Sequence, residues 1–367
     1  MSGAYIRGMG LSCALGEDVA HCVSAMQAMR VGPTALQLDG FDEPIQLPYY
    51  RIPDSAELLD GERCTHLLPS VVRAAVQQAG LDAAEIRKLP LFIGSSCFSI
   101  GRSESLYQAA LAQHAETALP MPLCGYQDIG EIVRRTLGCA GDSWTYNTAC
   151  TASANALLGA VHMIEWGWCR HALVVGMELA NRTTLTGFSG LQLVSDAVRP
   201  FDAERKGMVF GEAIGAVLLS AQPGSGARIR VVGGANNCDT WSVTTANPDG
   251  DSVAAVLSTA LERIKLQAGQ VRGIKAHATG TLTGDIAEAH GLCRVFDKLP
   301  PVSVLKPFIG HTLGACGITE LVLFATALQH GFLPAAPECE TLDTTLGISP
   351  LTAPLPAPDG YYLLNQF

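Results

Sequence analysis

Short apolar stretches rich in β-branched residues alternate with longer segments of helical periodicity along this 367-residue chain. This alternation is typical of α/β proteins, in which helices cover the faces of a sheet. The predicted strands are Ala4–Gly8, Leu89–Gly94, Ser143–Thr148, His171–Gly176, Ala213–Leu219, Ala227–Gly233, Val271–His277, Val302–Leu305 and Tyr361–Asn365. The predicted helices are Glu17–Met29, Cys64–Ala79, Ile129–Leu137, Ala152–Glu165, Ser252–Ala268, Ile286–Phe296 and Cys316–His330.

The second half of the chain repeats the order of elements found in the first half, which indicates an internal duplication. The break falls at Pro223-Gly224-Ser225-Gly226, a composition that favours turns. We therefore predict two halves, residues 1–222 and 227–367. The Pro-rich stretch Leu333–Pro358 is predicted to be an irregular surface loop.

The composition excludes several functional classes. Hydrophobic residues make up 48% and charged residues 16%, so the chain is not disordered in general. A net charge of −10 disfavours binding to nucleic acid. There is no stretch of about 18 apolar residues to span a membrane, and no secretory signal is visible. The 12 cysteines form no CxxC pairs, which predicts buried thiols in a reducing cytoplasm.

The first candidate for chemistry is a cysteine between a predicted strand and a predicted helix. The segment is Asn147-Thr148-Ala149-Cys150-Thr151-Ala152-Ser153-Ala154. A thiol at a helix N-terminus is favoured as the thiolate by the unpaired N–H groups and the helix dipole. Cys150 could therefore be a nucleophile that carries an acyl group. The alternative is an ordinary buried cysteine.

Two histidines follow later strands in similar surroundings. His277 lies in Lys275-Ala276-His277-Ala278-Thr279-Gly280-Thr281-Leu282-Thr283-Gly284-Asp285, and His311 in Lys306-Pro307-Phe308-Ile309-Gly310-His311-Thr312-Leu313-Gly314-Ala315-Cys316-Gly317. Each could be structural when taken alone. Ligands bind at the carboxyl ends of strands in α/β sheets, so the three residues together favour acyl chemistry. Zinc binding by one cysteine and two histidines is the weaker alternative, because no fourth ligand is evident.

At these residues the chain resembles the elongating β-ketoacyl-acyl-carrier-protein synthases of the thiolase superfamily. The family pattern T-A-C-x-[ST]-[SG/A] appears here as Thr148-Ala149-Cys150-Thr151-Ala152-Ser153. The pattern H-G-T-x-T-x-x-G-D appears as His277–Asp285, and K-x-x-x-G-H-x-x-G-A-x-G-x-x-E as Lys306–Glu320. The segment P-F-D-x-x-R-x-G matches Pro200–Gly207. The resemblance covers nearly the whole chain, and the second histidine separates it from initiating synthases, which resemble Cys-His-Asn.

The resemblance implies a duplicated, five-layered α-β-α-β-α thiolase fold that works as a homodimer or as a heterodimer with a related synthase. Cys150 would accept an acyl group from the phosphopantetheine of an acyl carrier protein. Malonyl-acyl-carrier protein would then lose carbon dioxide and attack the Cys150 thioester. His277 and His311 would both donate hydrogen bonds to the malonyl thioester oxygen. Lys306 and Glu320 would support His311, and no metal or organic cofactor is implied.

The resemblance also implies substrate contacts and a docking surface. Thr279 and Thr281 match a pair that binds the pantetheine arm, Thr244 matches a position near the malonyl group, and Phe188 matches an aromatic residue of a gating loop. The carrier protein of this family is acidic, so a chain of net charge −10 needs local cations for steering. The candidate cations are Arg63, Arg134, Arg135, Arg205 and Lys206.

Some positions depart from the family pattern. The usual Gly after the first histidine is Ala278, and a usual Asp is Lys206. The family ends in N-S-F-G-F-G-G-T-N, whereas this sequence stops at Leu364-Asn365-Gln366-Phe367. The missing stretch normally supplies a backbone donor to the acyl oxyanion, so we expect a naturally short chain, a substitute from another segment or subunit, or reduced activity. The departures favour a specialised fatty-acid, aryl-polyene or polyketide pathway.

Two other functions remain open at this point. Some synthase homologues are chain-length or assembly partners of an active synthase, although such partners usually lose the nucleophile. A thiolase acting on coenzyme A would need a second cysteine near the C-terminus as a base. Cys316 lies within the His311 motif and Cys339 in a Pro-rich loop, so neither fits that role well.

Overall fold

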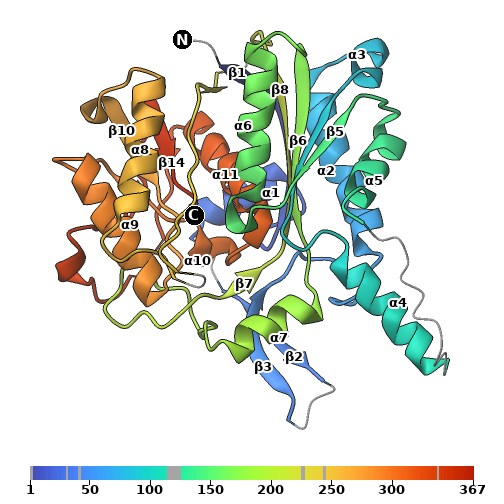
Figure 1. Cartoon of the computed structure of the whole chain (residues 1–367), viewed down its shortest axis with the longest axis horizontal. Helices are drawn as coiled ribbons and strands as arrows, with labels where there is room; N and C mark the ends of the chain where they lie inside the picture. Colours follow the sequence, from blue (N-terminus) through green and yellow to red (C-terminus); the bar gives the residue numbers. More distant parts are fainter. Residues whose placement is uncertain are drawn as a thin grey trace.

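The computed structural model of the chain describes residues 3–29, 32–39, 43–113, 125–224, 228–242, 245–336 and 339–367. Helices and two sheets alternate in five layers, as Figure 1 shows. No helix within these described residues is long and apolar enough to cross a bilayer.

The larger sheet has the strand order β5-β4-β6-β8-β1-β9. Its strands are β5 (Ser143–Tyr146), β4 (Leu91–Gly94), β6 (His171–Glu178), β8 (Ala213–Ser220), β1 (Ala4–Cys13) and β9 (Arg230–Val231). Every residue of β6 and β8 is buried, as expected for central strands covered on both faces. β5 forms one edge of the sheet and pairs with β4 alone among the described strands.

Helices cover both faces of the larger sheet. The helices on the outer face are α2 (Arg63–Ala79) and α5 (Asp128–Leu137), and those on the inner face are α6 (Ala152–Glu165) and α11 (Cys316–Gln329). Two glycines of β1 allow α2 to approach closely. A Cβ at Gly8 would lie 1.9 Å from the Ala75 carbonyl oxygen, and one at Gly10 would lie 2.0 Å from that of Val71.

The smaller sheet is parallel and has the order β11-β10-β14, with β11 (Val302–Ser303), β10 (Val271–Lys275) and β14 (Tyr361–Leu364). Its outer helices are α8 (Asp251–Arg263) and α9 (Leu282–Val295) (Figure 1). A third group of elements extends from the body of the molecule: β2 (Thr34–Leu38), β3 (Ile45–Tyr50), β7 (Phe210–Gly211), α4 (Ile100–Ala112) and α7 (Arg182–Gly190). The remaining short elements are α1 (Val19–Gln27), α3 (Ala83–Arg87), α10 (Lys306–Ile309), β12 (Phe332–Leu333) and β13 (Leu355–Pro356).

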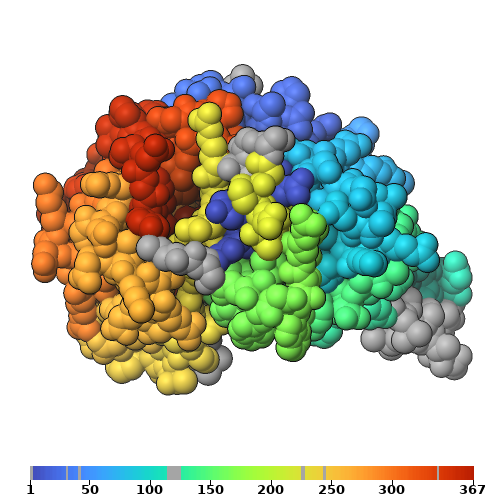
Figure 2. All heavy atoms as spheres, turned by 90° about the horizontal axis from the view of Figure 1, so that it is seen from above, coloured from blue at the N-terminus to red at the C-terminus, as the bar shows by residue number. Residues whose placement is uncertain are grey.

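The structure confirms the predicted alternation and corrects several details. The β2–β3 hairpin and helices α4 and α7 were not predicted. Helix α9 begins at Leu282, four residues before the prediction. Residue 227 of the predicted strand 227–233 lies outside the described residues, and the rest contains only β9, which pairs with β1 in the larger sheet instead of joining the second half. Figure 2 shows the stretch around β9, in yellow, between the C-terminal half in orange and red and the N-terminal half in blue to green.

The predicted loop Leu333–Pro358 is largely irregular in its described part, although it contains the 3-10 turn Thr344–Leu346 and strand β13. The division of the chain into halves 1–222 and 227–367 stays a prediction.

Candidate active site

Cys150 lies in the 3-10 turn Ala149–Thr151 that joins β5 to α6. Ala149 has a φ of 51°, a left-handed conformation that costs about 1–2 kcal/mol for a residue with a Cβ. This turn places the thiol at the start of a 14-residue helix, as the sequence predicted.

His277 follows the end of β10. The backbone N–H groups of His277 and Ala278 donate to the two carboxylate oxygens of Glu288, at 2.6 and 2.7 Å. Ala278 has a φ of 53°, which explains why the family pattern has glycine at this position. Glu288 on α9 therefore holds the turn that carries His277.

His311 follows Gly310, whose φ is 68°. A Cβ at Gly310 would lie 2.7 Å from the Tyr50 ring. The Leu313 N–H donates to Nδ1 of His311 at 3.2 Å, so Nδ1 is an acceptor and the neutral ring carries its hydrogen on Nε2. The Cys316 thiol lies 3.1 Å from the same Nδ1. Burial raises the pKa of Cys316 to about 12, so this thiol stays protonated.

The three predicted residues meet across the two halves of the chain. Cys150 Sγ lies 3.1 Å from Nε2 of His311, and the ligating atoms of Cys150, His277 and His311 all lie within 4.8 Å of one another. The rings of His277 and His311 are 5.4 Å apart and nearly perpendicular. The contact between Cys150 and His311 depends on close packing of α6 and α11, because a Cβ at Gly317 would lie 2.3 Å from the Ala154 nitrogen.

Burial controls the protonation of the three groups. It raises the pKa of the Cys150 thiol to about 11, although Lys306 opposes the shift. It lowers the pKa of His311 to about 3, and Lys306 adds to the effect. Burial also lowers the pKa of His277 well below its ordinary value, and the charge of Lys306 lowers it further. Both imidazoles are therefore neutral at neutral pH.

The same three atoms are the donors that a zinc site would use. The Nε2–H of His311 points at the sulfur, so His311 acts toward Cys150 as a hydrogen-bond donor. The described residues place no fourth His, Cys, Asp or Glu in this group. The geometry fits acyl chemistry better than metal binding.

A buried charge cluster lies directly behind the histidines. Glu320 receives Lys306 Nζ on one oxygen at 2.8 Å and Lys275 Nζ on the other, and all three side chains are at most 1% exposed. Lys306 Nζ also donates to the His277 carbonyl oxygen at 2.6 Å. Burial alone would raise the pKa of Glu320, but the two lysines hold it at about 2. Lys306 therefore contacts His277, and Glu320 holds Lys306, whereas the resemblance assigned both residues to His311.

Three further residues at the site were not predicted as functional. Asn365 donates to Glu288 at 2.7 Å, the Gln366 side chain contacts both His277 and Glu320, and the Phe367 ring lies 4.7 Å from the His277 ring. They follow β14, which lies beside β10 in register with Lys275. Their alignment with the first three positions of the family's C-terminal pattern, N-S-F, is the signal that could have identified them.

The other predicted site residues have different outcomes. The hydroxyls of Thr279 and Thr281 lie 2.9 Å apart, next to His277 in the chain. Phe188 on α7 packs against Phe210, with ring centroids 4.9 Å apart, and Phe210 in turn lies over His311. Thr244 lies outside the described residues. The substrate contacts of these residues stay predictions.

Two of the predicted docking cations are wrong. Arg63 is 1% exposed and binds both oxygens of Glu212. Arg205 is 5% exposed and binds Asp343. Neither can meet a partner protein, because each already neutralises a carboxylate. Arg135 and Lys206 are exposed, and Arg134 is half-buried.

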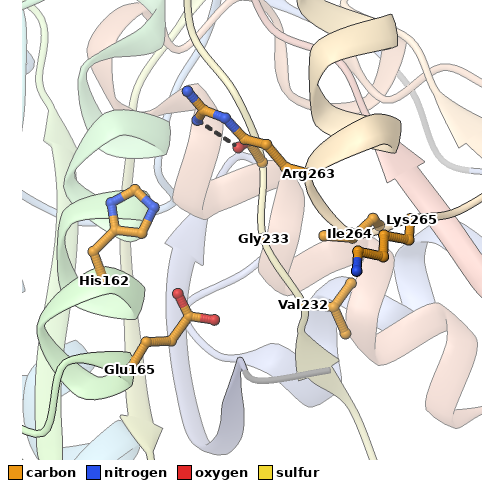
Figure 3. Close-up of a pocket in the computed structure, with 8 residues that line it drawn as sticks. His162, Glu165, Val232, Gly233, Arg263, Ile264 and Lys265 are labelled. Atoms are coloured by element: carbon orange, nitrogen blue, oxygen red, sulfur yellow. Dashed lines mark hydrogen bonds between the residues drawn. The ribbon is translucent and has the colours of Figure 1, made fainter.

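A cavity of about 380 Å³ lies away from the site. Figure 3 shows its lining, with His162 and Glu165 from the end of α6 opposite Arg263, the last residue of α8, and Lys265, two residues beyond it. The dashed line there marks the hydrogen bond from Arg263 to the Gly234 carbonyl oxygen. At about 1.5 Å per helical residue, the length of α6 separates this cavity from Cys150 by roughly 20 Å.

Solved structures with a similar fold include a ketosynthase (ApeO) in complex with its chain length factor (ApeC) from Xenorhabdus doucetiae. That match has a TM-score of 0.84 at 23% identity and covers 97% of this chain and 92% of the other. The AntDE:AntF complex of a type II polyketide synthase acyl-carrier protein with its ketosynthase matches with a TM-score of 0.85 at 18% identity. That match covers 100% of this chain and 96% of the other. These likenesses show the thiolase-like ketosynthase fold.

Sequence relatives agree with the fold. A putative mitochondrial 3-oxoacyl-[acyl-carrier-protein] synthase of Schizosaccharomyces pombe is 34% identical over 210 residues, which is 52% of this chain and 49% of that protein. The 3-oxoacyl-[acyl-carrier-protein] synthase 2 of Mycobacterium leprae is 26% identical over 79% of this chain and 73% of its own length. Residues 47–223 match the beta-ketoacyl synthase N-terminal domain, and residues 229–340 match its C-terminal domain. The chain therefore belongs to the beta-ketoacyl synthase family.

Proposed function

We propose that this chain catalyses the decarboxylative condensation of an enzyme-bound acyl group with malonyl-acyl-carrier protein, as an acyltransferase. The observation that carries the proposal is the approach of Cys150 Sγ to His311 Nε2 at 3.1 Å, with His277 completing the group. Nucleophile and imidazoles come from different halves of the chain, so their meeting is a property of the fold.

In the first step, the Cys150 sulfur attacks the thioester carbonyl of an acyl-carrier protein. The acyl group moves to Sγ, and the pantetheine thiol leaves with the proton. The Nε2–H of His311 supports this step, because it can donate to the sulfur as negative charge develops there. The N-terminus of α6 adds a favourable dipole at the same sulfur.

In the second step, malonyl-acyl-carrier protein loses carbon dioxide and forms an enolate. The enolate carbon attacks the Cys150 thioester, and the Cys150 thiolate leaves as the β-ketoacyl product forms. The Nε2–H of His311 is available for the enolate oxygen once the sulfur is acylated. Thr279 and Thr281 are proposed to hold the pantetheine arm, and Phe188 to line the acyl side through its contact with Phe210.

The proposed pathway is fatty-acid, aryl-polyene or polyketide synthesis, with an acidic acyl carrier protein as the partner. Arg135 and Lys206 are the exposed cations among the original candidates. The eleven cysteines of the described residues are free thiols, which supports a reducing, cytoplasmic location.

The test is the intact mass of the purified protein after incubation with a panel of acyl-carrier proteins. We expect an acyl adduct on the parent and none on Cys150→Ala. Cys139→Ala is the matched control, because it removes another buried thiol on the far side of the larger sheet. Malonyl-acyl-carrier protein is then added, and loss of the adduct with release of a β-ketoacyl product completes the reaction. No adduct from any donor would contradict the proposal.

A second candidate is a partner subunit that does little chemistry alone. The exposed edge of β5 favours an assembly, since Ser143 and Thr145 present unpaired backbone there and Cys150 follows four residues after the strand. We propose that β5 pairs with the same strand of a second synthase chain, in a homodimer or a heterodimer. Activity that appears only after a second synthase is mixed in would favour the partner subunit.

A further inference from the structure

Gln366 occupies a position where the family's C-terminal pattern has serine, and its side chain reaches the site. Its Oε1 lies 2.9 Å from Nδ1 of His277, and its Nε2 lies 2.8 Å from Glu320 Oε2. Serine is too short to reach both partners. The bridge between His277 and Glu320 is therefore a feature of this chain rather than of the pattern.

The orientation of the Gln366 amide follows from Glu320. The pKa of Glu320 is about 2 because of Lys275 and Lys306, so its carboxylate is ionised and can only accept hydrogen bonds. The amide nitrogen must face that carboxylate, which turns the amide oxygen toward His277. An amide oxygen has no hydrogen to give, so the 2.9 Å contact is a hydrogen bond only if Nδ1 of His277 carries the hydrogen.

Lys306 competes with Gln366 for Nδ1 of His277. Its Nζ lies 3.2 Å from Nδ1, but it makes shorter bonds to the His277 carbonyl oxygen at 2.6 Å and to Glu320 at 2.8 Å. If Lys306 donated to Nδ1, the Gln366 oxygen would face a nitrogen lone pair at 2.9 Å. Turning the amide over would instead place its oxygen 2.8 Å from a carboxylate oxygen. A hydrogen on Nδ1 avoids both contacts.

We propose that Gln366 is a positioning residue that holds His277 in its Nδ1–H tautomer, so that Nε2 of His277 meets the reacting atoms with a lone pair. His311 has the opposite tautomer, because the Leu313 N–H occupies its Nδ1. The two imidazoles thus have different roles. Only His311 offers an N–H to the developing charge, and His277 accepts a hydrogen bond from water or substrate. This division rests on the proposed function and departs from the expectation that both histidines donate.

The test is the protonation of His277, read by ¹⁵N nuclear magnetic resonance of the full chain labelled at histidine. The His277 signals are those lost in His277→Asn. We expect Nδ1 protonated in the parent. In Gln366→Met, Lys306 Nζ is the hydrogen-bonding group left at Nδ1 among the described residues and donates to it, so the hydrogen should move to Nε2. A parent with Nε2 protonated, or an unchanged tautomer in Gln366→Met, would overturn the proposal.

Kinetics supply a second readout. Gln366→Met should slow the consumption of malonyl-acyl-carrier protein by about tenfold, the effect of roughly one hydrogen bond, and leave acyl transfer to Cys150 within about twofold. Equal slowing of both steps would indicate a merely structural role and refute the assignment. Gln329→Met on the exposed end of α11 is the matched control. Gln366→Ser, which restores the family residue, should behave like Gln366→Met and serves if that variant does not fold.

The two proposals fail separately. If the unmodified protein catalyses the condensation but His277 carries its hydrogen on Nε2, the proposed function stands and the inference about Gln366 is wrong. If His277 carries its hydrogen on Nδ1 but the unmodified protein never forms an acyl adduct, the inference about the His277 ring stands and the proposed function is wrong.

Discussion

The substitution Glu320→Gln tests how the buried charges behind the site are held. It keeps the shape of the side chain and leaves the ammonium groups of Lys275 and Lys306 without their shared carboxylate. Breaking a buried ion pair by removing one partner costs about 3–5 kcal/mol, because an uncompensated charge stays inside the protein. We expect a loss of stability in that range.

The pKa of Glu320 gives a similar estimate of how much its ion pairs contribute to the free energy of unfolding. It falls from an ordinary 4.5 to about 2 in the folded chain, and at about 1.36 kcal/mol per pH unit this corresponds to about 3 kcal/mol. Because the folded pKa is the lower one, this stabilisation is present above pH 4.5 and is lost as the pH falls toward 2. The stability of Glu320→Gln should therefore depend less on pH in that window.

The measurement is urea unfolding of the parent and the variant at neutral pH and at several points below pH 4.5. Glu262→Gln on the exposed face of α8 is the matched control and should cost less than about 0.5 kcal/mol. The double variant Lys275→Met/Glu320→Gln removes one of the stranded cations. It should cost about 1–3 kcal/mol less than the sum of the two single variants. A cost below about 1 kcal/mol for Glu320→Gln, or additive effects, would refute this reading of the cluster.

Three further predictions concern the nucleophile and its setting. The rate of Cys150 alkylation by iodoacetamide should rise about tenfold per pH unit from pH 7 to 10, because only the thiolate reacts and its pKa is about 11; a plateau near pH 8 would contradict the burial argument. Gly317→Ala should lower the stability in calorimetry and acyl transfer in the mass assay. Its Cβ would lie 2.3 Å from the Ala154 nitrogen and push His311 away from the Cys150 sulfur. Unchanged activity would disprove this dependence of the site on helix packing. Ala149→Val should cost about 1–3 kcal/mol at a φ of 51°, whereas Ala149→Gly should be neutral or stabilising in the same unfolding assay.

The sequence predicted the larger elements because they are long and strongly patterned. The buried strands β6 and β8 and the amphipathic helix α2 are examples. The β2–β3 hairpin was missed although Asp39-Gly40 in its connection favours a turn, because four of the five residues of β2 are at least partly exposed and no buried apolar run marks that strand. The start of α9 was placed late, since Leu282 to Asp285 read as part of the small-residue motif.

Cys150 and His277 each follow a strand end, which periodicity can locate, whereas the short helix α10 separates β11 from His311. The charge cluster could not be found in this way. Lys275 is one residue in a strand pattern, and its partner Glu320 is 45 residues away on a helix. Arg63 was mistaken for a surface cation for the same reason, since nothing in the local sequence reveals its pairing with Glu212.

The strand order of the larger sheet has a consequence for synthesis on the ribosome. β1 is made first, yet its main partner β8 follows about 200 residues later. At roughly 5–20 residues per second, the apolar first strand waits about 10–40 s before that partner emerges. During this time it is an unpaired strand edge of the kind that promotes aggregation. We therefore expect the nascent chain to depend on chaperones until β8 has been made, and the yield of active protein to fall when translation is slowed between β1 and β8.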